Sequence, residues 1–336
     1  MNATILSNNE KHYPVLLKEI LSIISPQNGG TFIDCTFGQG GYSKSILKFS
    51  KTKVLAIDRD IDCKKIAENL ERKNKKRFIF YNKKFSNIDQ INCENLKIKA
   101  IIFDLGYSYT QIKDPEKGLS FENTGLLNMR MGINEFTASD VINKLEQNDL
   151  ELIFKFFGDE KKSKLIAKKI VSERSRGLID TQKLVKIINS SKKNNNKKTH
   201  NATKVFQALR IFVNKEISEL VYGLIKSVKI LEKNGLIVVV SFHSLEDKII
   251  KYFFKSLSEQ SKNSRYYPES VEKKKILKLE TKKPIVPSKG EIAINNPSRS
   301  AKLRYAIKIN NEKDFEKNFL KKFENLLEIE RLSRKL

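Results

Sequence analysis

The feature that most limits how this chain can fold is the alternation of short apolar segments with helical segments over its first third. Four runs rich in β-branched and aromatic residues are predicted to be strands: residues 31–35, 53–57, 78–81 and 100–103. Segments with helical periodicity lie before and between them, at residues 14–25, 43–49 and 61–73. Because the strands are apolar throughout and alternate with helices, the pattern predicts an α/β fold with a mostly parallel sheet, covered by helices on both faces.

The strand pattern stops after the fourth strand and resumes much later in the chain. From about residue 114 to 231 the patterns are helical: 138–145, 149–157, 159–173, 181–189 and a long stretch from 203. An apolar run at 236–241, followed by a helix at 245–257, restores the strand pattern. We therefore expect a discontinuous α/β domain over residues 1–113 and 232–310, an inserted all-helical domain over 114–231 and a charged helical tail over 311–336.

Two segments near the C-terminus complete the predicted sheet domain. Residues 258–297 are polar, rich in lysine and interrupted by four prolines, so at most one short strand is expected there. Residues 302–309 are expected to close the sheet as an edge strand.

The charge balance points to an anionic macromolecule as the partner. The chain has 65 lysine and arginine residues against 39 aspartate and glutamate residues, a formal net charge of +26, which favours nucleic acid or anionic lipid. Drift toward the Lys, Asn and Ile codons of an AT-rich genome would also raise the charge, and this alternative stays open. The longest aliphatic run, at 236–240, is far shorter than the roughly 18 residues of a membrane span. A soluble, unexported, cytoplasmic protein is therefore expected.

A glycine-rich turn follows the first predicted strand. The strand ends at Asp34, and Gly38, Gly40 and Gly41 then lead into a helix, so backbone amides can approach a nucleotide without side chains in the way. The spacing is Gly-x-Gly-Gly, which does not meet the dinucleotide fingerprint Gly-x-Gly-x-x-Gly and disfavours a nicotinamide-dependent dehydrogenase. A plain tight turn is the simpler alternative.

Carboxylates follow the next strands at the same expected edge of the sheet. Asp58 ends the second strand 24 positions after Asp34, where a carboxylate can accept the hydroxyl groups of a ribose. The alternative for Asp58 is an N-cap for a helix that begins at Ile61. The fourth strand ends at Asp104, and Ser108 lies just beyond it. The carboxyl ends of parallel strands are where open α/β sheets bind ligands, so this edge is the predicted site.

Six motif blocks extend this pattern along most of the chain. They are D-x-T-x-G-x-G-G at 34–41, D-L-G-x-S-x-x-Q at 104–111, N-M-R-M at 128–131, F-Q-A-L-R-I-x-V-N-x-E at 206–216, S-F-H-S-L-E-D at 241–247 and R-S-A-K-L-R at 299–304. In this order, from about residue 12 to 307, the chain resembles the bacterial 16S ribosomal RNA (cytosine-N4) methyltransferases, the RsmH/MraW family. The resemblance implies a class I, Rossmann-like methyltransferase with S-adenosyl-L-methionine as cofactor and an inserted helical substrate-recognition domain.

The resemblance also implies roles for individual residues. The cofactor-binding residues carried over are Gly40, Gly41 and Tyr42 for the methionine part, Asp58 for the ribose, Phe85 for the adenine region, and Asp104 and Gln111 for the rest of the pocket. The family usually has His where Tyr42 stands and Val where Tyr107 stands. The chain has three cysteines without a CxxC pair and no His at zinc-ligand spacing, so neither a disulfide framework nor a metal site is predicted.

The reacting centre is expected beside the fourth strand. Asp104 and Ser108 are the candidate catalytic residues, because they are the nearest polar groups in sequence that could orient a cytosine amine. The candidate substrate-binding residues are Ser241, His243, Arg130, Arg299 and Arg304. His243 could instead be a hydrogen-bonded structural histidine, and the segment around Arg130 could serve core packing.

The expected partner is 16S ribosomal RNA within the small ribosomal subunit. No membrane and no obligate protein partner is inferred. The alternative function is a catalytically impaired RNA-binding factor for ribosome assembly that keeps the same fold.

Overall fold

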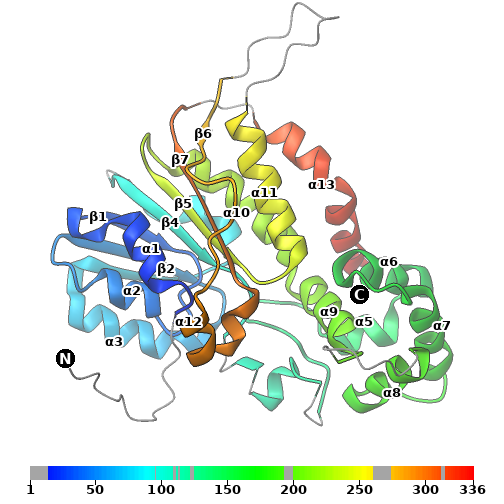
Figure 1. The fold of residues 1–336 in the computed structure, drawn as a ribbon. Helices are drawn as coiled ribbons and strands as arrows, with labels where there is room; N and C mark the ends of the chain where they lie inside the picture. Colours follow the sequence, from blue (N-terminus) through cyan, green and yellow to red (C-terminus); the bar gives the residue numbers. More distant parts are fainter. Residues whose placement is uncertain are drawn as a thin grey trace, which may run out of the picture.

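The core of the structure is a seven-stranded sheet with the strand order β3-β2-β1-β4-β5-β7-β6 (Figure 1). The computed structural model describes residues 14–94, 96–108, 111–112, 114–121, 125–192, 200–259, 274–311 and 315–336. The strands are β1 (Gly30–Asp34), β2 (Thr52–Asp58), β3 (Phe78–Asn82), β4 (Ile98–Asp104), β5 (Leu236–Ser241), β6 (Leu277–Lys278) and β7 (Lys302–Lys308). The four strands predicted in the first third, and the strand predicted after the long helical segment, are confirmed.

The pairing of the strands confirms a mostly parallel sheet. Strands β1 to β5 pair in parallel, and β4 pairs directly with β5 although residues 105–235 separate them in sequence. The strand β7 is antiparallel to β5. The prediction that β7 is an edge strand is wrong, because the two residues of β6 pair with Ile307 and Lys308 on its outer side.

Both faces of the sheet are covered, as the apolar strands predict. One face packs against α1 (Leu17–Ile24), α2 (Gly41–Ile46) and α3 (Lys64–Asn74), and the buried cluster there includes Ala100 and Ile102 of β4. The alternate residues of β4, Ile101 and Phe103, face the second cluster. That cluster includes side chains of α10 (Glu216–Ile230), α11 (Ser244–Ser258) and α13 (Glu316–Arg331), which lie on the opposite side of the sheet in Figure 1.

The helical segment between β4 and β5 forms a bundle beside the sheet. Its other helices are α5 (Ala138–Lys144), α6 (Gln147–Gly158), α7 (Ser163–Arg174), α8 (Thr181–Ser191) and α9 (Thr203–Asn214). Helix α6 packs on α7 and α9, and α7 packs on α8. Helix α10, within the same sequence range, packs against the 3₁₀ helix η4 (Phe85–Gln90) of the sheet domain and against α13. The division of the chain at residue 231 stays a prediction.

Two further features concern the helices outside the bundle. In its described part, the polar segment after α11 contains the short helix α12 (Lys289–Ile294), which the sequence did not predict, in addition to β6.

Within the described ranges, no helix has both the length and the apolarity that crossing a membrane requires.

The C-terminal helix α13 caps the start of α10. The buried carboxylate of Glu330 accepts the backbone amides of Ile217 and Ser218, each at 2.8 Å. These amides belong to the first turn of α10, where helix N–H groups have no partner within the helix. Burial raises the pKa of Glu330 to about 7, partly offset by the hydrogen bonds from Ser218 and Ile217. The predicted terminal helix is therefore an integral part of the fold.

Removing this cap should destabilise the whole protein. Glu330→Ala leaves two buried amides without an acceptor and is expected to lower the free energy of unfolding by about 2 kcal/mol. Glu330→Gln keeps one carbonyl acceptor and should lose less. Glu324→Ala, at an exposed position of the same helix, is the control and should change stability by less than about 0.5 kcal/mol. Urea unfolding measures all three, and equal stability of Glu330→Ala and Glu324→Ala would contradict the capping role.

Candidate functional site

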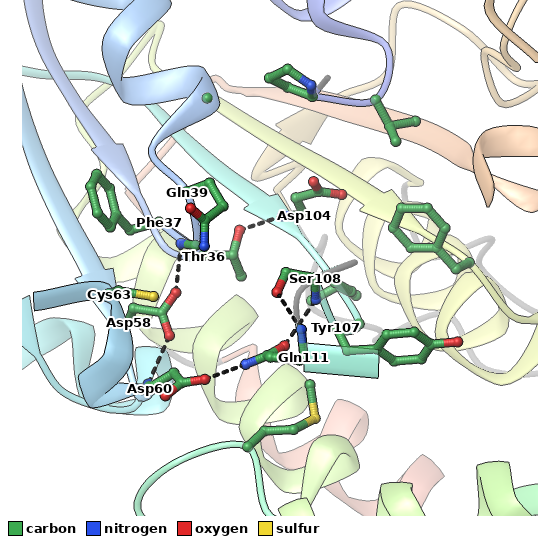
Figure 2. Close-up of a pocket in the computed structure, with 18 of the residues that line it drawn as sticks. Thr36, Phe37, Gln39, Asp58, Asp60, Cys63, Asp104, Tyr107, Ser108 and Gln111 are labelled. Atoms are coloured by element: carbon green, nitrogen blue, oxygen red, sulfur yellow. Dashed lines mark hydrogen bonds between the residues drawn. The ribbon is translucent and has the colours of Figure 1, made fainter. Parts of the chain in front are cut away.

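A cavity of about 1120 Å³ lies at the carboxyl ends of β1, β2 and β4. The lining comes from the glycine turn, from the ends of these strands and from the start of α10. Pro14 and Val15 before α1, and residues 294–297 at the end of α12 and just beyond it, also line the cavity. Figure 2 shows the labelled side chains converging on it from these separate elements. Of the predicted cofactor and catalytic residues, this lining contains Gly41, Tyr42, Asp58, Phe85, Asp104, Ser108 and Gln111.

The glycine turn provides the backbone wall of the cavity. Gly38 and Gly40 have positive φ angles of 50° and 73°, which residues with a Cβ rarely adopt. Gly40 is the N-cap of α2 and is not among the residues that line the cavity. A Cβ on Gly40 would lie 2.8 Å from the ring of Phe37. A Cβ on Gly41 would lie 2.2 Å from Pro14. The glycines are therefore required by the turn itself and by the close packing of the N-terminal segment.

Asp58 fixes the geometry between the first and second strands. Its Oδ2 accepts the amide of Gly38 at 2.7 Å, and its Oδ1 accepts the amide of Asp60 at 2.8 Å. Burial raises the pKa of Asp58, and the two amides work against that rise. The alternative that Asp58 caps the helix starting at Ile61 is wrong, because the cap is Asp60, which accepts the amide of Asp62.

Asp60, which the sequence did not predict as a site residue, accepts hydrogen bonds from two side chains. Its Oδ2 accepts hydrogen bonds from the side chains of Gln111 and Lys117, and both donors also line the cavity. Burial opposes ionisation of Asp60, but the bonds from Lys117 and Gln111 outweigh it and hold the pKa below its ordinary value. The sequence signal for Asp60 was its position two residues beyond Asp58, which ends β2.

Asp104 is a buried carboxyl with an incomplete set of partners. Its Oδ2 contacts the hydroxyl of Tyr42 at 3.3 Å, but that single phenol hydrogen also faces the carbonyl of Val15 at 2.6 Å. Its Oδ1 has no hydrogen-bond partner within the described part of the chain. Burial, with a further contribution from nearby Asp34, raises the pKa of Asp104 to about 8. A cationic group entering the cavity would stabilise the ionised form of Asp104.

Ser108 and Gln111 hold each other across a tight turn. The side chain of Gln111 accepts the amide of Ser108 at 2.9 Å, and the hydroxyl of Ser108 accepts the amide of Gln111 at 3.3 Å (Figure 2). Since Gln111 also donates to Asp60, the predicted catalytic serine is linked to the carboxylates at the end of the second strand. The neighbouring positions 109–110 lie outside the described residues.

Phe85 forms an apolar part of the cavity wall, and contacts with β4 and α10 hold it in place. Its ring meets that of Phe103 edge to face at 5.4 Å between centroids. Glu219 of α10 accepts both the amide and the hydroxyl of Ser86, at 3.2 and 2.9 Å, and so fixes the turn that carries Phe85. A Cβ on Gly223 would lie 2.8 Å from Phe85, so the glycine permits α10 to approach this closely. Glu219 was not predicted from the sequence.

Comparison with known proteins agrees with this geometry. A family model described as the MraW methylase family matches residues 9–309. The chain belongs to the MraW methylase family. Two relatives named ribosomal RNA small subunit methyltransferase H share 43% identity over 304 residues in Rickettsia bellii and 41% over 301 residues in Rickettsia massiliae. The alignments cover 89% and 88% of this chain and 99% and 98% of those relatives.

Solved structures are more distant from this MraW-family chain. An rRNA methylase from Streptococcus thermophilus has 11% sequence identity and a TM-score of 0.35, over 87% of this chain and 96% of that chain. The assignment of the fold therefore rests on the sheet order and on the family, and both agree with the class I methyltransferase fold expected from the sequence.

The predicted substrate residues lie outside the cavity lining of this methylase. Ser241 donates to the backbone carbonyl of Lys302, and Arg304 forms an ion pair with Asp247 at 2.7 Å. Other partners are Asn296 for Arg299 and Asn128 for Arg130. The imidazole of His243 accepts the amide of Glu246 in a capping box at the start of α11, which favours the structural alternative for this histidine.

One group of side chains near the cavity has the composition of a metal site. Glu216, His243 and Glu246 bring potential ligand atoms within 4.8 Å of one another. Both carboxylate oxygens of Glu216 are 2.9 Å from the guanidinium of Arg210, however. A cation added there would face the buried positive charge of Arg210, so these contacts favour an ion-pair network over a metal centre.

The geometry at Asp58 yields a test of the predicted cofactor. S-adenosylmethionine should bind without added metal, and Asp58→Ala should weaken its binding by about 1–3 kcal/mol, the cost of removing a charged acceptor. Asp89→Ala, on an exposed carboxylate paired with Lys226, is the control and should leave affinity unchanged. Calorimetry in the presence of a chelator measures both, with thermal unfolding recorded alongside because Asp58 also holds Gly38. Unchanged affinity in a folded Asp58→Ala protein would remove Asp58 from the site.

Proposed function

We propose that this protein transfers a methyl group from S-adenosylmethionine to the N4 amine of a cytidine in 16S ribosomal RNA of the small ribosomal subunit. The observation that carries the proposal is the convergence of distant motif residues on one cavity in an MraW-family chain. The names of the two Rickettsia relatives support ribosomal RNA of the small subunit as the substrate. The cytoplasm, where such RNA is assembled in bacteria, is the proposed location.

The chemistry of the cavity fits a nucleoside with a cationic sulfur. Asp58 and the Asp60–Gln111 pair supply acceptors and donors for a ribose, while Phe85 supplies an apolar surface for a base. The Oδ1 of Asp104, which has no hydrogen-bond partner among the described residues, offers a buried acceptor for a positively charged group. S-adenosylmethionine, when bound, would supply a methyl group on a sulfonium, and the group that leaves is the neutral thioether of S-adenosylhomocysteine.

The residues of the cavity have two tasks in the reaction. The lone pair of the cytosine amine is conjugated into the ring, so the protein must orient the amine toward the methyl donor and accept a hydrogen bond from it. Asp104, at the end of β4, and Ser108 beyond it are the proposed groups for this orientation. Alignment of this kind can lower a barrier by about 7–11 kcal/mol.

The inserted helices are proposed to hold the RNA. Lys169, Lys183 and Lys186 line a groove of about 440 Å³ between α7 and α8, and the side chains of Lys161, Lys164 and Lys168 on the same bundle are exposed. Contacts between such lysines and phosphates supply salt-dependent affinity. Arg174 and the lysines near residue 270 are further basic groups of the sequence that could contact phosphates. Arg174 donates to the carbonyls of Ile142 and Leu145 inside the bundle, and residues 260–273 lie outside the described part of the chain.

The decisive experiment separates the proposed enzyme from a factor that only binds RNA. Small subunits from cells with and without this protein are compared for N4-methylcytidine, and purified subunits are incubated with the protein and labelled S-adenosylmethionine. Transfer of label to the RNA supports the enzyme. RNA binding without transfer would favour the catalytically impaired assembly factor.

The raised pKa of Asp104 predicts how cofactor affinity depends on pH. Below about pH 8 the free protein holds a proton on Asp104, and binding a cationic ligand must release it. Affinity for S-adenosylmethionine should therefore rise between pH 6 and pH 8, by up to about tenfold per unit, with proton release visible as a buffer-dependent heat. Asp104→Asn should abolish both effects. A pH-independent affinity in the unaltered protein would contradict the assignment.

Ser108 has two possible contributions, and one variant distinguishes them. If its hydroxyl orients the amine, Ser108→Ala should lower the single-turnover methylation rate by roughly tenfold to a thousandfold and leave cofactor affinity nearly intact. If its hydroxyl only holds Gln111, cofactor affinity should fall instead. Ser256→Ala on α11, whose hydroxyl donates to the carbonyl of Phe253 in the same helix, is the control. A normal rate for Ser108→Ala would end its catalytic assignment.

A further inference from the structure

An exposed aromatic ring lies in the wall of the cavity, beyond the residues assigned above. Tyr107 lines the cavity, and 42% of the residue is exposed. Figure 2 shows its ring projecting away from Asp58 and Asp60, the side of the cavity proposed to hold the ribose. An exposed aromatic ring does not gain the stabilisation that burial of apolar surface brings. The exposed surface of Tyr107 is therefore available for contact with a ligand.

One face of this ring is supported by a buried ion pair. The guanidinium of Arg210 lies 4.9 Å from the centroid of the Tyr107 ring, within the range of a cation–π contact. Its Nε and Nη2 atoms bond to the two carboxylate oxygens of Glu216, each at 2.9 Å. The side chains of Arg210 and Glu216 are only 11% and 14% exposed. Arg210 therefore supports the ring from one side as a fixed, planar group.

The corner that carries this ion pair is itself held rigidly. Helices α9 and α10 meet at Lys215, whose φ of 50° turns the chain sharply and brings Arg210 within reach of Glu216. The buried side chain of Asn214 donates to the carbonyls of Met129 and Arg210 and accepts the amide of Met131. These contacts explain the motif at 206–216, of which Glu216 alone lines the cavity.

We propose that Tyr107 is the stacking platform for the pyrimidine base that reacts. A base that leaves its helical stack loses a few kcal/mol, and stacking on an aromatic side chain restores part of this loss. Tyr107 follows Asp104 by three residues, so the same turn that holds the acceptor for the amine presents the ring. The other aromatic residues of the lining are Phe37, Tyr42, Phe85 and Phe242. Phe37 and Tyr42 are buried, Phe85 is assigned to the cofactor, and Phe242 is less exposed than Tyr107, so Tyr107 offers the most open ring to the substrate. This assignment rests on the proposed function and adds to it the residue that receives the base.

Substitutions at Tyr107 separate stacking from simple filling of space. Tyr107→Phe keeps the aromatic face and should retain kcat/KM for small subunits within about threefold. Tyr107→Leu keeps an apolar side chain without an aromatic face and should lower kcat/KM by about 10- to 100-fold. Affinity for S-adenosylhomocysteine should stay within about twofold of normal in both, since the ring is assigned to the base and not to the cofactor.

The absence of tryptophan from the chain allows a direct measurement of stacking. Tyr107→Trp places the single tryptophan of the chain at the proposed platform, and protein-free small-subunit RNA should quench the tryptophan emission when S-adenosylhomocysteine is present. Tyr305→Trp, on β7 and outside the cavity lining, is the control and should be quenched much less. Filter binding confirms in parallel that both variants hold the RNA.

Three outcomes would contradict the proposal that Tyr107 stacks on the reacting base. They are wild-type kcat/KM in Tyr107→Leu, a loss of cofactor affinity equal to its loss of activity, and unquenched emission from Tyr107→Trp while the RNA is bound. Failure of the proposed function has a different signature, because the unaltered protein would then transfer no methyl group to small subunits.

Discussion

The parallel pairing of β4 with β5 is the constraint on which the rest of the structure depends. The chain leaves the sheet at Asp104 and returns at Leu236, yet the two strands are hydrogen-bonded neighbours. Because the two strands are parallel, the segment between them leaves at the carboxyl edge of the sheet and must return to the amino edge, and α10 makes this return. This requirement brings the corner between α9 and α10 to the edge where β1, β2 and β4 end, so that Glu216 and Glu219 become part of the cavity wall.

The strand ends concentrate carboxyl groups at this edge of the sheet, and the protein balances their charge unevenly. Asp34 is fully buried and accepts the hydroxyl of Ser43, yet burial still raises its pKa to about 6. Asp60 has a lysine partner, whereas in the described structure Asp104 has one weak contact and one oxygen without a partner. Like charges this close together favour a proton or a cation in the site. These carboxyl groups therefore favour a proton on Asp104 or a positively charged group close to it.

Segments from both ends of the chain stabilise the site from outside the sheet. Pro14 packs on Gly41, and the carbonyl of Val15 accepts the hydroxyl of Tyr42, so the N-terminal segment holds the glycine turn. At the other end, Glu330 of α13 caps α10, and α10 carries Glu219, which fixes the turn of Phe85. Stability and ligand binding are therefore connected through contacts between residues that are distant in sequence.

The sequence by itself determined the strands, the glycine turn and the convergence of Asp58 and Asp104 on one edge. These features follow from local properties: β-branched apolar runs form strands, and parallel strands end at a common edge. The tertiary structure decided which polar groups are partners. It placed Asp60 and Glu219 in the wall and paired Arg304 with Asp247. Local sequence carries no record of a partner 50 or 150 positions away, because only the folded chain brings such groups within hydrogen-bond distance.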